Sequence, residues 1–370
     1  GGYRTGLYTS PHLARVNERI RIDGRDISDD QFAACYFRVD DCARRLVSEE
    51  RLKGHPSFFE AMTAVAFLAF AEQGIDIAVL EVGMGGRLDA TNIVEPLVSV
   101  ITDISLDHTE WLGNTITEIA REKAGILRQN GVLVTLPQHP EANQAIGEAA
   151  MALNVRGVNA AEYIPSRGDE SRAYPLTVLG ERIIAESPLT GAHQHRNLAL
   201  AIATAVELCN HDGYKLTPEQ IADGIRATRW PGRLERFSRA GRPDVLLDVA
   251  HNPAGAWALR SALSHLDPQP ATMTAIFGCL KDKAFTEMAQ VLFPLFDTVV
   301  LTEVSSPRTA SLQAMQTAAE ATGTRVLTAS SPKEALAKVL ELTPLDGIVV
   351  ATGSVYLVGE IRSLLMESGS

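Results

Sequence analysis

Residues 75–92 read IDIAVLEVGMGGRLDATN, and this stretch decides the fold. Its first half is an apolar run of strand length, and its second half is a glycine-rich turn. A continuous apolar run of this kind is typical of a buried strand in a parallel sheet. Glu81 stands at the junction, so a carboxylate follows the strand directly. The stretch therefore predicts an α/β protein with a polar group at the carboxyl end of a central strand.

A second predicted strand, also followed by a polar residue, comes next along the chain. The apolar run LVSVITDI (97–104) predicts another buried strand, and His108 follows it in SLDHTEWLG. Helical segments alternate with these strands, which indicates βαβ units and a parallel sheet covered by helices. In such sheets ligands bind outside the carboxyl ends of the strands. We therefore expect Glu81 and His108 to lie near one ligand.

Lys123 lies where a charged side chain is unexpected. Thr115 and Glu118 form a capping box, which predicts the start of a helix. On that helix Lys123 falls within the apolar face, which consists of Ile116, Ile119, Ala120 and Leu127. A buried, unpaired ammonium is costly, so Lys123 should either meet an anion or change its chemical form. The alternative is a lysine that reaches solvent or a salt-bridge partner.

Length, composition and charge exclude several classes of protein. The 370 residues are 45% hydrophobic, and their length suggests two domains. No apolar run reaches the roughly 18 residues that span a bilayer, and a net charge of −11 argues against nucleic acid as a partner. The four cysteines lack the spacing of a disulfide scaffold and indicate a reducing compartment. An anionic ligand would need local basic groups, for which the candidates are Arg15, Arg19, Arg21, Arg87 and Arg233.

We place a domain boundary at the turn Trp230-Pro231-Gly232-Arg233. Residues 1–232 form the first domain, with a small antiparallel excursion at about 155–190, and residues 233–370 form a second α/β domain. The remaining strands are predicted at 18–22, 245–250, 274–277, 298–302, 325–328 and 347–351. Helices are predicted from Ser28 towards residue 50, from Ser57 to Gly74, after His195 and from Thr217.

Two motifs have both a structural and a functional interpretation. The glycines of VGMGGRLDATN follow the spacing G-x-G-G, and Leu88 occupies the position of a third glycine, which disfavours a nicotinamide dinucleotide site. This stretch is then a tight turn that lets the backbone pass close to a ligand. SFFE (57–60) is a capping box with two aromatic core residues, or else Phe58 or Phe59 supports a flat heteroaromatic ligand.

Two further motifs fall in the second half. LDVAHNPAG places Asp248 in a buried strand, where its carboxylate should accept hydrogen bonds from a ribose hydroxyl or from neighbouring main chain. ATGSVYLVGEI (351–361) indicates a strand, a turn and a helix start. We interpret this start as a simple helix cap rather than an anion site.

Ten motifs in one order resemble the folylpolyglutamate synthase and dihydrofolate synthase family, part of the Mur ligase superfamily. The resemblance extends from the first residues to about Arg362, and SFFE and SSPR favour the folate branch over the cell-wall Mur ligases. The motifs are TSPHL with NERIRIDG, SFFE, EVGMGGRLDATN, LDHTEWLG, REKAGI, HQHRN, WPGRLE, LDVAHNPAG, SSPR and ATGSVYLVGEIR.

The resemblance implies an ATP-dependent carboxylate–amine ligase. In this family ATP phosphorylates the carboxylate of a folate or dihydropteroate, and the amine of L-glutamate displaces phosphate from the acyl phosphate. The implied fold is a parallel-sheet nucleotide-binding domain followed by a smaller α/β domain. The implied protein is a cytoplasmic monomer that uses Mg²⁺, binds small-molecule substrates and interacts with neither nucleic acid nor membrane.

The resemblance also assigns roles to individual residues. Lys123 matches a lysine that is carbamylated in the family, and Lys123 and His108 are the expected catalytic residues. The expected Mg²⁺ ligands are Ser10, Glu81 and His108. The expected ATP contacts are Asn197, Arg233 and Asp248. The expected contacts to the pterin substrate are Ser57, Phe58, Phe59, Glu60, Leu88, Asp89 and Ala90.

One departure from the family pattern affects the expected activity. The family carries a phosphate-binding P-loop ahead of TSPHL, and this sequence contains no G-x-x-x-x-G-K-[ST]. We expect a truncated form of a parent enzyme, poor ATP binding by these 370 residues, and an exposed strand edge that favours aggregation. The alternatives are a non-catalytic pterin-binding remnant and a Mur-type ligase for another amino acid.

Overall fold

The protein divides into two compact units. The computed structural model describes residues 1–165 and 172–367. Unit 1 comprises Gly1–Tyr163 and Ala199–Ile221, and unit 2 comprises Ile164–Leu198 and Ala222–Ser370. Each unit contains two separate stretches of the chain, whereas the predicted domains are continuous. The domain boundary at residue 232 therefore remains a prediction. No helix in the described part of the chain is long and apolar enough to span a membrane.

The predicted α/β fold with parallel strands is confirmed in unit 1, where the described strands divide between two sheets. The first has the order β3-β2-β1-β4, in which β1 and β4 are parallel, and the second is the parallel sheet β5-β6-β7. Their strands are β1 (Thr5–Tyr8), β2 (Ile20–Ile22), β3 (Arg25–Asp26), β4 (Ile77–Leu80), β5 (Ser99–Ile101), β6 (Val132–Thr135) and β7 (Arg156–Asn159).

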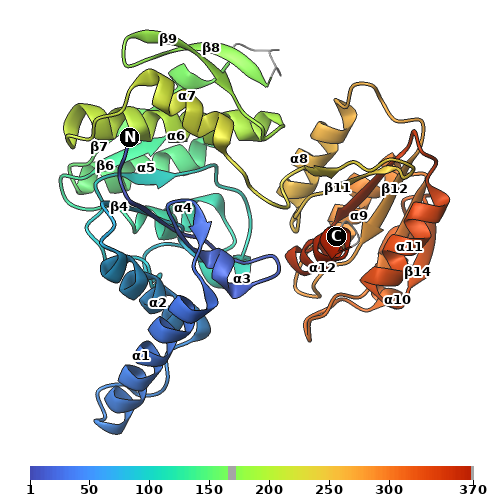
Figure 1. The fold of residues 1–370 in the computed structure, drawn as a ribbon, viewed down its shortest axis with the longest axis horizontal. Helices are drawn as coiled ribbons and strands as arrows, with labels where there is room; N and C mark the ends of the chain where they lie inside the picture. The colour runs from blue at the N-terminus through green and yellow to red at the C-terminus, as the bar shows by residue number, and fades with distance from the viewer. Residues whose placement is uncertain (166–171, 368–370) are drawn as a thin grey trace. The chain divides into compact units, whose positions relative to one another are not determined.

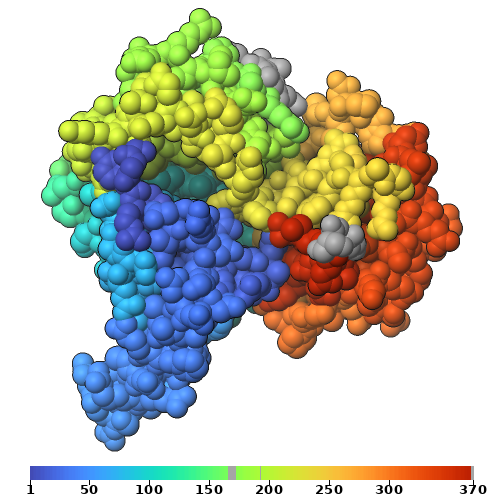
Figure 2. Space-filling model, viewed as in Figure 1, coloured from blue at the N-terminus to red at the C-terminus, as the bar shows by residue number. Residues whose placement is uncertain are grey.

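The predicted capping boxes set the starts of three helices. Ser28, Ser57 and Thr115 each accept a hydrogen bond from the main-chain N–H three residues on, and Gly74 ends α2 in the left-handed region at φ 58°. In Figures 1 and 2 the pair α1 and α2 projects from the rest of unit 1. The helices that precede the predicted boundary at residue 232 are α1 (Asp29–Ser48), α2 (Phe58–Gln73), α3 (Thr109–Leu112), α4 (Ile116–Ala124), α5 (Pro140–Ala152), α6 (Ala192–His211) and α7 (Pro218–Ala227).

The strand predicted at 18–22 begins later than expected. A 3₁₀ turn, η1 (Val16–Arg19), precedes β2. The cause is the Glu18 carboxylate, which accepts hydrogen bonds from the main-chain N–H groups of Leu13, Ala14 and Arg15. These bonds fold the chain into a compact loop before the strand can start.

The strand predicted at 75–82 is shorter and more exposed than expected. Strand β4 pairs with β1 on one side, and Val79 within it is 59% exposed. The other edge of β4 lines a cavity of about 750 Å³, and β5 lines the same cavity. The prediction of a fully buried strand is therefore wrong for β4, because in the described residues no strand covers this edge.

An open strand edge with an exposed valine should promote self-association. We expect Val79→Lys to raise the soluble fraction of the protein by about twofold or more, because a lysine on an edge strand opposes edge-to-edge pairing. Centrifugation and size-exclusion chromatography at matched concentrations would measure this change. Met151→Lys on α5 is the control, since Met151 is 78% exposed but lies on a helix. Equal improvement in both variants would contradict a role for the edge.

Unit 2 is built around a six-stranded sheet of order β10-β11-β15-β12-β13-β14. All of its strands except β10 run parallel, and helices cover both faces (Figure 1). The strands are β10 (Glu235–Phe237), β11 (Asp244–Leu247), β12 (Met273–Phe277), β13 (Thr298–Thr302), β14 (Arg325–Ala329) and β15 (Ile348–Thr352). The helices are α8 (Pro253–Ser264), α9 (Phe285–Leu292), η3 (Phe293–Leu295), α10 (Leu312–Glu320), α11 (Pro332–Leu342) and α12 (Val355–Glu367).

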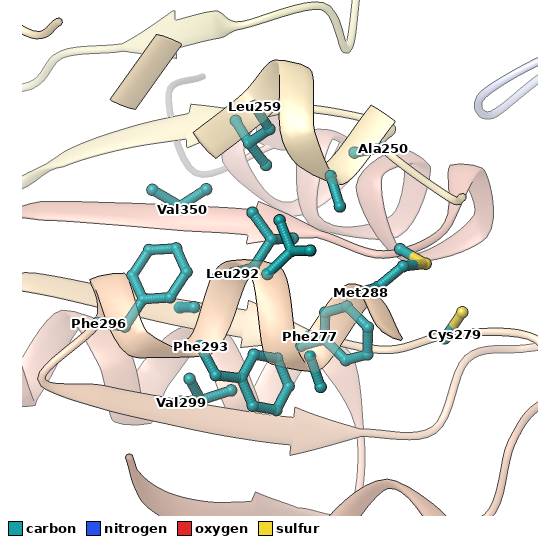
Figure 3. Packing of buried hydrophobic residues seen from close by; sticks show 14 of the residues in the cluster. Ala250, Leu259, Phe277, Cys279, Met288, Leu292, Phe293, Phe296, Val299 and Val350 are labelled. Atoms are coloured by element: carbon teal, nitrogen blue, oxygen red, sulfur yellow. The ribbon is translucent and has the colours of Figure 1, made fainter. Parts of the chain in front are cut away.

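The core of unit 2 explains why its strands were the easiest to predict. The side chains of Leu292, Phe293 and Phe296 pack on the sheet between α9 and the strands, and the rings of Phe277 and Phe293 meet edge to face at 5.1 Å (Figure 3). Every residue of β13 and β15 is buried. Strands covered on both faces carry unbroken apolar runs, so the sequence signal is strong.

The predicted excursion at 155–190 is partly confirmed. β8 (Ala173–Val178) and β9 (Glu181–Glu186) form an antiparallel hairpin. Residues 156–159, in contrast, form β7, which pairs in parallel with β6, and a 3₁₀ turn, η2 (Ala160–Tyr163), follows it. Residues 166–171 of the predicted excursion lie outside the described residues.

Candidate active site

The carboxyl ends of β1 and β4 place Ser10 next to Glu81. Glu81 follows β4 directly, and its Oε2 accepts a hydrogen bond of 2.7 Å from the main-chain N–H of Ser10. The Glu81 N–H in turn donates to the Tyr8 carbonyl at 2.9 Å, which continues the β1–β4 ladder. These bonds therefore fix the Ser10 main chain and the Glu81 carboxylate at one strand end, where ligands bind in parallel sheets.

The glycine-rich turn after β4 packs closely against α4. A Cβ on Gly86 would lie 2.9 Å from the carbonyl oxygens of Glu122 and Lys123, so a larger residue would push the turn away from the helix. The Arg87 N–H donates to the Glu122 carbonyl at 2.9 Å, and the two side chains form a salt bridge at 3.0 Å. This contact brings the end of α4, and Lys123 with it, to the end of β4.

Lys123 is a partly buried cation beside the Glu81 strand end. Burial lowers the pKa of the Lys123 amine, and the Asp107 carboxylate opposes that change. Glu81 and Lys123 both line the cavity of about 750 Å³. The predicted capping box is therefore confirmed, and Lys123 is partly buried on the helix whose Ile119 and Ala120 lie in the core.

His108 is connected to this group through its neighbour Asp107. Its backbone has φ 52°, in the left-handed region, and its N–H donates to Asp107 Oδ1 at 2.8 Å. The His108 ring lies 4.0 Å from the same carboxylate and is not part of the cavity lining. Asp107 was missed from the sequence, although it stands directly before His108 in SLDHTEWLG.

A metal ion at this strand end would depend on oxygen ligands. No group of three or more His, Cys, Asp and Glu side chains clusters for a metal in residues 1–165 and 172–367. The predicted set includes the hydroxyl of Ser10, whose main-chain N–H donates to the Glu81 carboxylate. Carboxylate and hydroxyl oxygens with added waters suit Mg²⁺, so Ser10 and Glu81 fit this ion and His108 remains a predicted ligand.

The four residues of the SFFE segment have different roles: some stabilise the start of α2 or pack inside the unit, and one is exposed. Ser57 and Glu60 cap α2, and these hydrogen bonds lower the pKa of Glu60. The Phe59 ring is wedged beneath Gly83, where an added Cβ would lie 2.4 Å from it. Phe58 is 58% exposed. Of the two predicted aromatic contacts, Phe58 is therefore the one open to a ligand.

Asp89 organises the turn that carries the other predicted substrate contacts. Its carboxylate accepts hydrogen bonds from the N–H groups of Gly83 and Met84 at 3.0 Å and from Thr91 at 2.9 Å. Leu88 beside it is 81% exposed, and Ala90 is half-buried. The turn thus presents Leu88 outward, while Asp89 holds its shape.

The three predicted ATP contacts lie in unit 2. Asp248 follows β11, is 8% exposed, and accepts hydrogen bonds from the Leu234 and Ala250 N–H groups at 3.1 and 3.0 Å. Burial raises the pKa of Asp248 to about 6, and the Arg233 guanidinium acts in the opposite direction. Asn197 is exposed and donates to Gln194 at 3.2 Å. The structure brings Arg233 and Asp248 together but shows no direct contact of either with Asn197 in the described residues.

The raised pKa of Asp248 makes stability depend on pH. The folded state holds the proton more tightly than the unfolded state, so the stabilisation is present below about pH 4 and is lost as the pH rises through about 6. The rise from 3.8 to about 6 corresponds to about 3 kcal/mol. Relative to Asp248→Asn, we expect the wild type to lose about that much unfolding free energy between pH 4 and 7.

Urea denaturation across this pH range would measure the loss. Asp346→Asn is the control, because Asp346 is exposed. If the difference in unfolding free energy between the wild type and Asp248→Asn does not change with pH, folding does not raise the pKa of Asp248 and this prediction is wrong.

Comparisons with known proteins identify the family of this chain. Two family models match the chain: the Mur ligase middle domain at residues 43–205 and the Mur ligase glutamate ligase domain at residues 232–355. The folylpolyglutamate synthase of Lacticaseibacillus casei is 36% identical over 382 residues, which cover 100% of this chain and 85% of the relative. The dihydrofolate synthase/folylpolyglutamate synthase of Mycobacterium tuberculosis is 36% identical over 98% of this chain and 80% of the relative.

Solved structures extend the similarity to the fold. The M. tuberculosis folylpolyglutamate synthase complexed with ADP and AMPPCP matches with a TM-score of 0.87 and 35% identity, over 98% of this chain and 85% of that one. E. coli FolC in complex with DHPP and ADP matches with a TM-score of 0.83 and 27% identity, over 100% of this chain and 83% of that one.

Proposed function

The chain belongs to the folylpolyglutamate synthase and dihydrofolate synthase family of the Mur ligases, and on this premise we propose that its parent enzyme adds L-glutamate to a folate or dihydropteroate. The activity is that of an ATP-dependent carboxylate–amine ligase. An oxygen of the acceptor carboxylate attacks the γ-phosphorus and ADP leaves, which gives an acyl phosphate. The glutamate nitrogen then attacks the acyl carbon, loses a proton, and phosphate leaves.

The single observation that supports the proposal is the end of β4, where the Glu81 carboxylate accepts a hydrogen bond from the Ser10 main chain and Glu81 lines the same cavity as Lys123. Both reactants of the first step are anions, so the site must neutralise charge. We assign the Ser10 hydroxyl, the Glu81 carboxylate and the His108 imidazole as ligands of Mg²⁺. When bound, Mg²⁺ supplies electrostatic stabilisation of the charge on the transferred phosphoryl group. The residues of the chain hold this position rigid, because Glu81 is tied to the Ser10 main chain.

Lys123 has a second possible chemical form. Its lowered pKa keeps a larger fraction of the amine neutral, and a neutral amine can react with CO₂ to form a carbamate. We propose that Lys123 is carbamylated, which would replace a desolvated cation by an anion next to the metal position. Together with His108 it forms the proposed catalytic pair.

The remaining assignments follow the surfaces that the two units present. Phe58 and Leu88 are exposed beside capped and hydrogen-bonded turns, which supports the segments 57–60 and 88–90 as the acceptor site. Asn197, Arg233 and Asp248 are the proposed ATP contacts in unit 2. We further propose a cytoplasmic monomer whose two domains meet at residue 232.

Glutamate-dependent ADP release tests the proposal. A parent protein that includes the upstream coding sequence should release ADP only when L-glutamate and either a folate or dihydropteroate are present. Absence of turnover with both acceptors would reject the proposed activity. Replacing L-glutamate by other amino acids in the same assay tests the alternative of a Mur-type ligase with another substrate.

A second candidate function is a pterin-binding protein without catalysis. Within residues 1–165 and 172–367, no strand pairs with the second edge of β4 or of β5, and this observation supports the second candidate. This candidate predicts pterin binding by calorimetry with no nucleotide hydrolysis. An in-frame GTNGKG-like stretch in the upstream DNA would favour the enzyme, and a start codon without one would favour the remnant.

A further inference from the structure

The turn that carries Arg233 in unit 2 has an unusual backbone. Gly232 before it has φ 73°, and Leu234 after it has φ 49°. Glycine adopts such angles without cost, whereas a leucine in the left-handed region is strained. Strain of this kind persists only where the surrounding structure holds the backbone in place, and it is concentrated at functional sites. The contacts that hold this turn, and the side chain that it presents, are therefore of functional interest.

Hydrogen bonds hold the main chain of this turn on both sides. The Gly232 N–H donates to Glu235 Oε2 at 2.8 Å, and the Gly232 carbonyl accepts a bond of 2.9 Å from the Val249 N–H. The Leu234 N–H donates to Asp248 Oδ2 at 3.1 Å. Both flanking residues are therefore fixed, and the carboxylates of Glu235 and Asp248 help to maintain the strained angle of Leu234.

Arg362 in turn fixes the Glu235 carboxylate. The Arg362 Nε donates to Glu235 Oε1 at 3.1 Å and to Oε2 at 3.0 Å, and the two side chains are only 26% and 22% exposed. Glu235 is the first residue of β10, whereas Arg362 lies on α12. A charge-assisted pair that is partly shielded from water restricts the orientation of both groups. The carboxylate that supports the turn is thus anchored to a helix 127 residues further along the chain.

The turn presents the Arg233 side chain to solvent. Arg233 is exposed, and in residues 1–165 and 172–367 its guanidinium forms no hydrogen bond or salt bridge. Burial raises the pKa of Asp248 and the Arg233 charge opposes this rise, but that carboxylate already accepts two main-chain hydrogen bonds. The neighbouring Arg236, in contrast, pairs with Asp244 at 2.7 Å. Arg233 is therefore a cation available to a ligand, on a backbone that is held in place.

We infer that Glu235 is a positioning residue: held by Arg362, it fixes the turn that presents Arg233 to the phosphates of the nucleotide. This role rests on the proposed ATP contact of Arg233. A guanidinium binds phosphate oxygens through paired, charge-assisted hydrogen bonds, which require a defined orientation. A backbone that is already in the binding conformation loses less entropy when the ligand binds. Glu235 thus acts through Arg233 and touches no ligand itself.

Binding of AMPPCP, an ATP analogue with three phosphates, tests this role in a parent protein that includes the upstream coding sequence. Arg233→Gln should weaken binding about 10- to 100-fold, because charged hydrogen bonds to phosphate are lost. Glu235→Ala should weaken binding about 3- to 10-fold, because the turn is no longer preorganised. In the Arg233→Gln background, however, Glu235→Ala should change the affinity by less than about twofold, since its effect passes through Arg233. Calorimetry would measure all four affinities.

A second variant and a control accompany this cycle. Arg362→Gln keeps the Glu235 carboxylate but releases it from α12, and its effect should depend on Arg233 in the same way. This variant provides the test if thermal unfolding shows that Glu235→Ala does not fold. Arg236→Gln is the control, because this exposed arginine pairs with Asp244 and should leave the affinity within about twofold of the wild type.

Separate outcomes would overturn the role of Glu235 and the proposed function. If Glu235→Ala has no effect, or weakens binding equally with and without Arg233, Glu235 only stabilises unit 2 and the inference is wrong. If Arg233→Gln alone leaves the affinity unchanged, Arg233 is not a nucleotide contact and the inference also fails, although the proposed ligase activity stands. If the parent protein binds no AMPPCP, the proposed ATP-dependent activity is itself rejected.

Discussion

Lys123→Met is expected to lower the rate of glutamate-dependent ADP release by the parent enzyme about 100- to 1000-fold. The reason is that Lys123 lines the same cavity as Glu81, where the proposed mechanism requires the amine or its carbamate to act on the charged reactants. Thermal unfolding should stay unchanged or shift upward, because methionine retains the apolar stem and removes a cation that burial disfavours. A loss of activity without a loss of stability separates a role in the reaction from a role in packing.

Arg121→Met is the matched control for this variant. Arg121 lies on the same helix but is exposed, and it pairs with Glu148 at 3.4 Å. Its replacement should leave the rate within about twofold of the wild type. If Lys123→Met is equally active, Lys123 is an ordinary lysine whose amine reaches solvent.

Two measurements would identify the chemical form of Lys123. Mass spectrometry of the intact protein under native conditions should detect one added carbamate group, which acidification removes. In the Lys123→Ala variant, short carboxylic acids should restore part of the activity if the functional group is an anion. Rescue by amines instead would show that Lys123 acts as a cation.

Features of this fold that depend on neighbouring residues could be predicted from the sequence. The helices α1, α2 and α4 start at Ser28, Ser57 and Thr115 because each capping box satisfies main-chain groups within three residues. The strands of unit 2 could be placed because apolar residues cover both of their faces. Glu81 and Lys123 were linked through strand-end geometry and helical period, and the structure places both at one cavity.

Features that depend on distant segments could not be predicted. Val79 is exposed in a part of the described fold where no strand pairs with the second edge of β4, and no local sequence pattern reveals this. The different roles of Phe58 and Phe59 follow from Gly83, which lies more than twenty residues away and covers only one of the two rings. Asp107 was overlooked because its influence on Lys123 arises from folding the β5 loop onto α4.

Glu81→Gln is expected to raise the Mg²⁺ concentration for half-maximal ADP release at least about tenfold and to lower the maximal rate about 100-fold. Glutamine keeps an oxygen that can accept the hydrogen bond from the Ser10 N–H, so the strand end should keep its shape. The variant loses only the negative charge that a divalent cation requires. Titration of the parent enzyme with Mg²⁺ at saturating substrates would measure both changes.

Glu95→Gln distinguishes a ligand from the general charge of the cavity. Glu95 lines the same cavity, but it pairs with Arg128 at 3.5 Å and its side chain is 86% exposed. If the negative charge of the cavity as a whole attracts the cation, both variants should shift the Mg²⁺ requirement. If Glu81 binds the ion, only Glu81→Gln should shift it. A lower rate with an unchanged Mg²⁺ requirement in Glu81→Gln would mean that Glu81 acts by holding the Ser10 main chain.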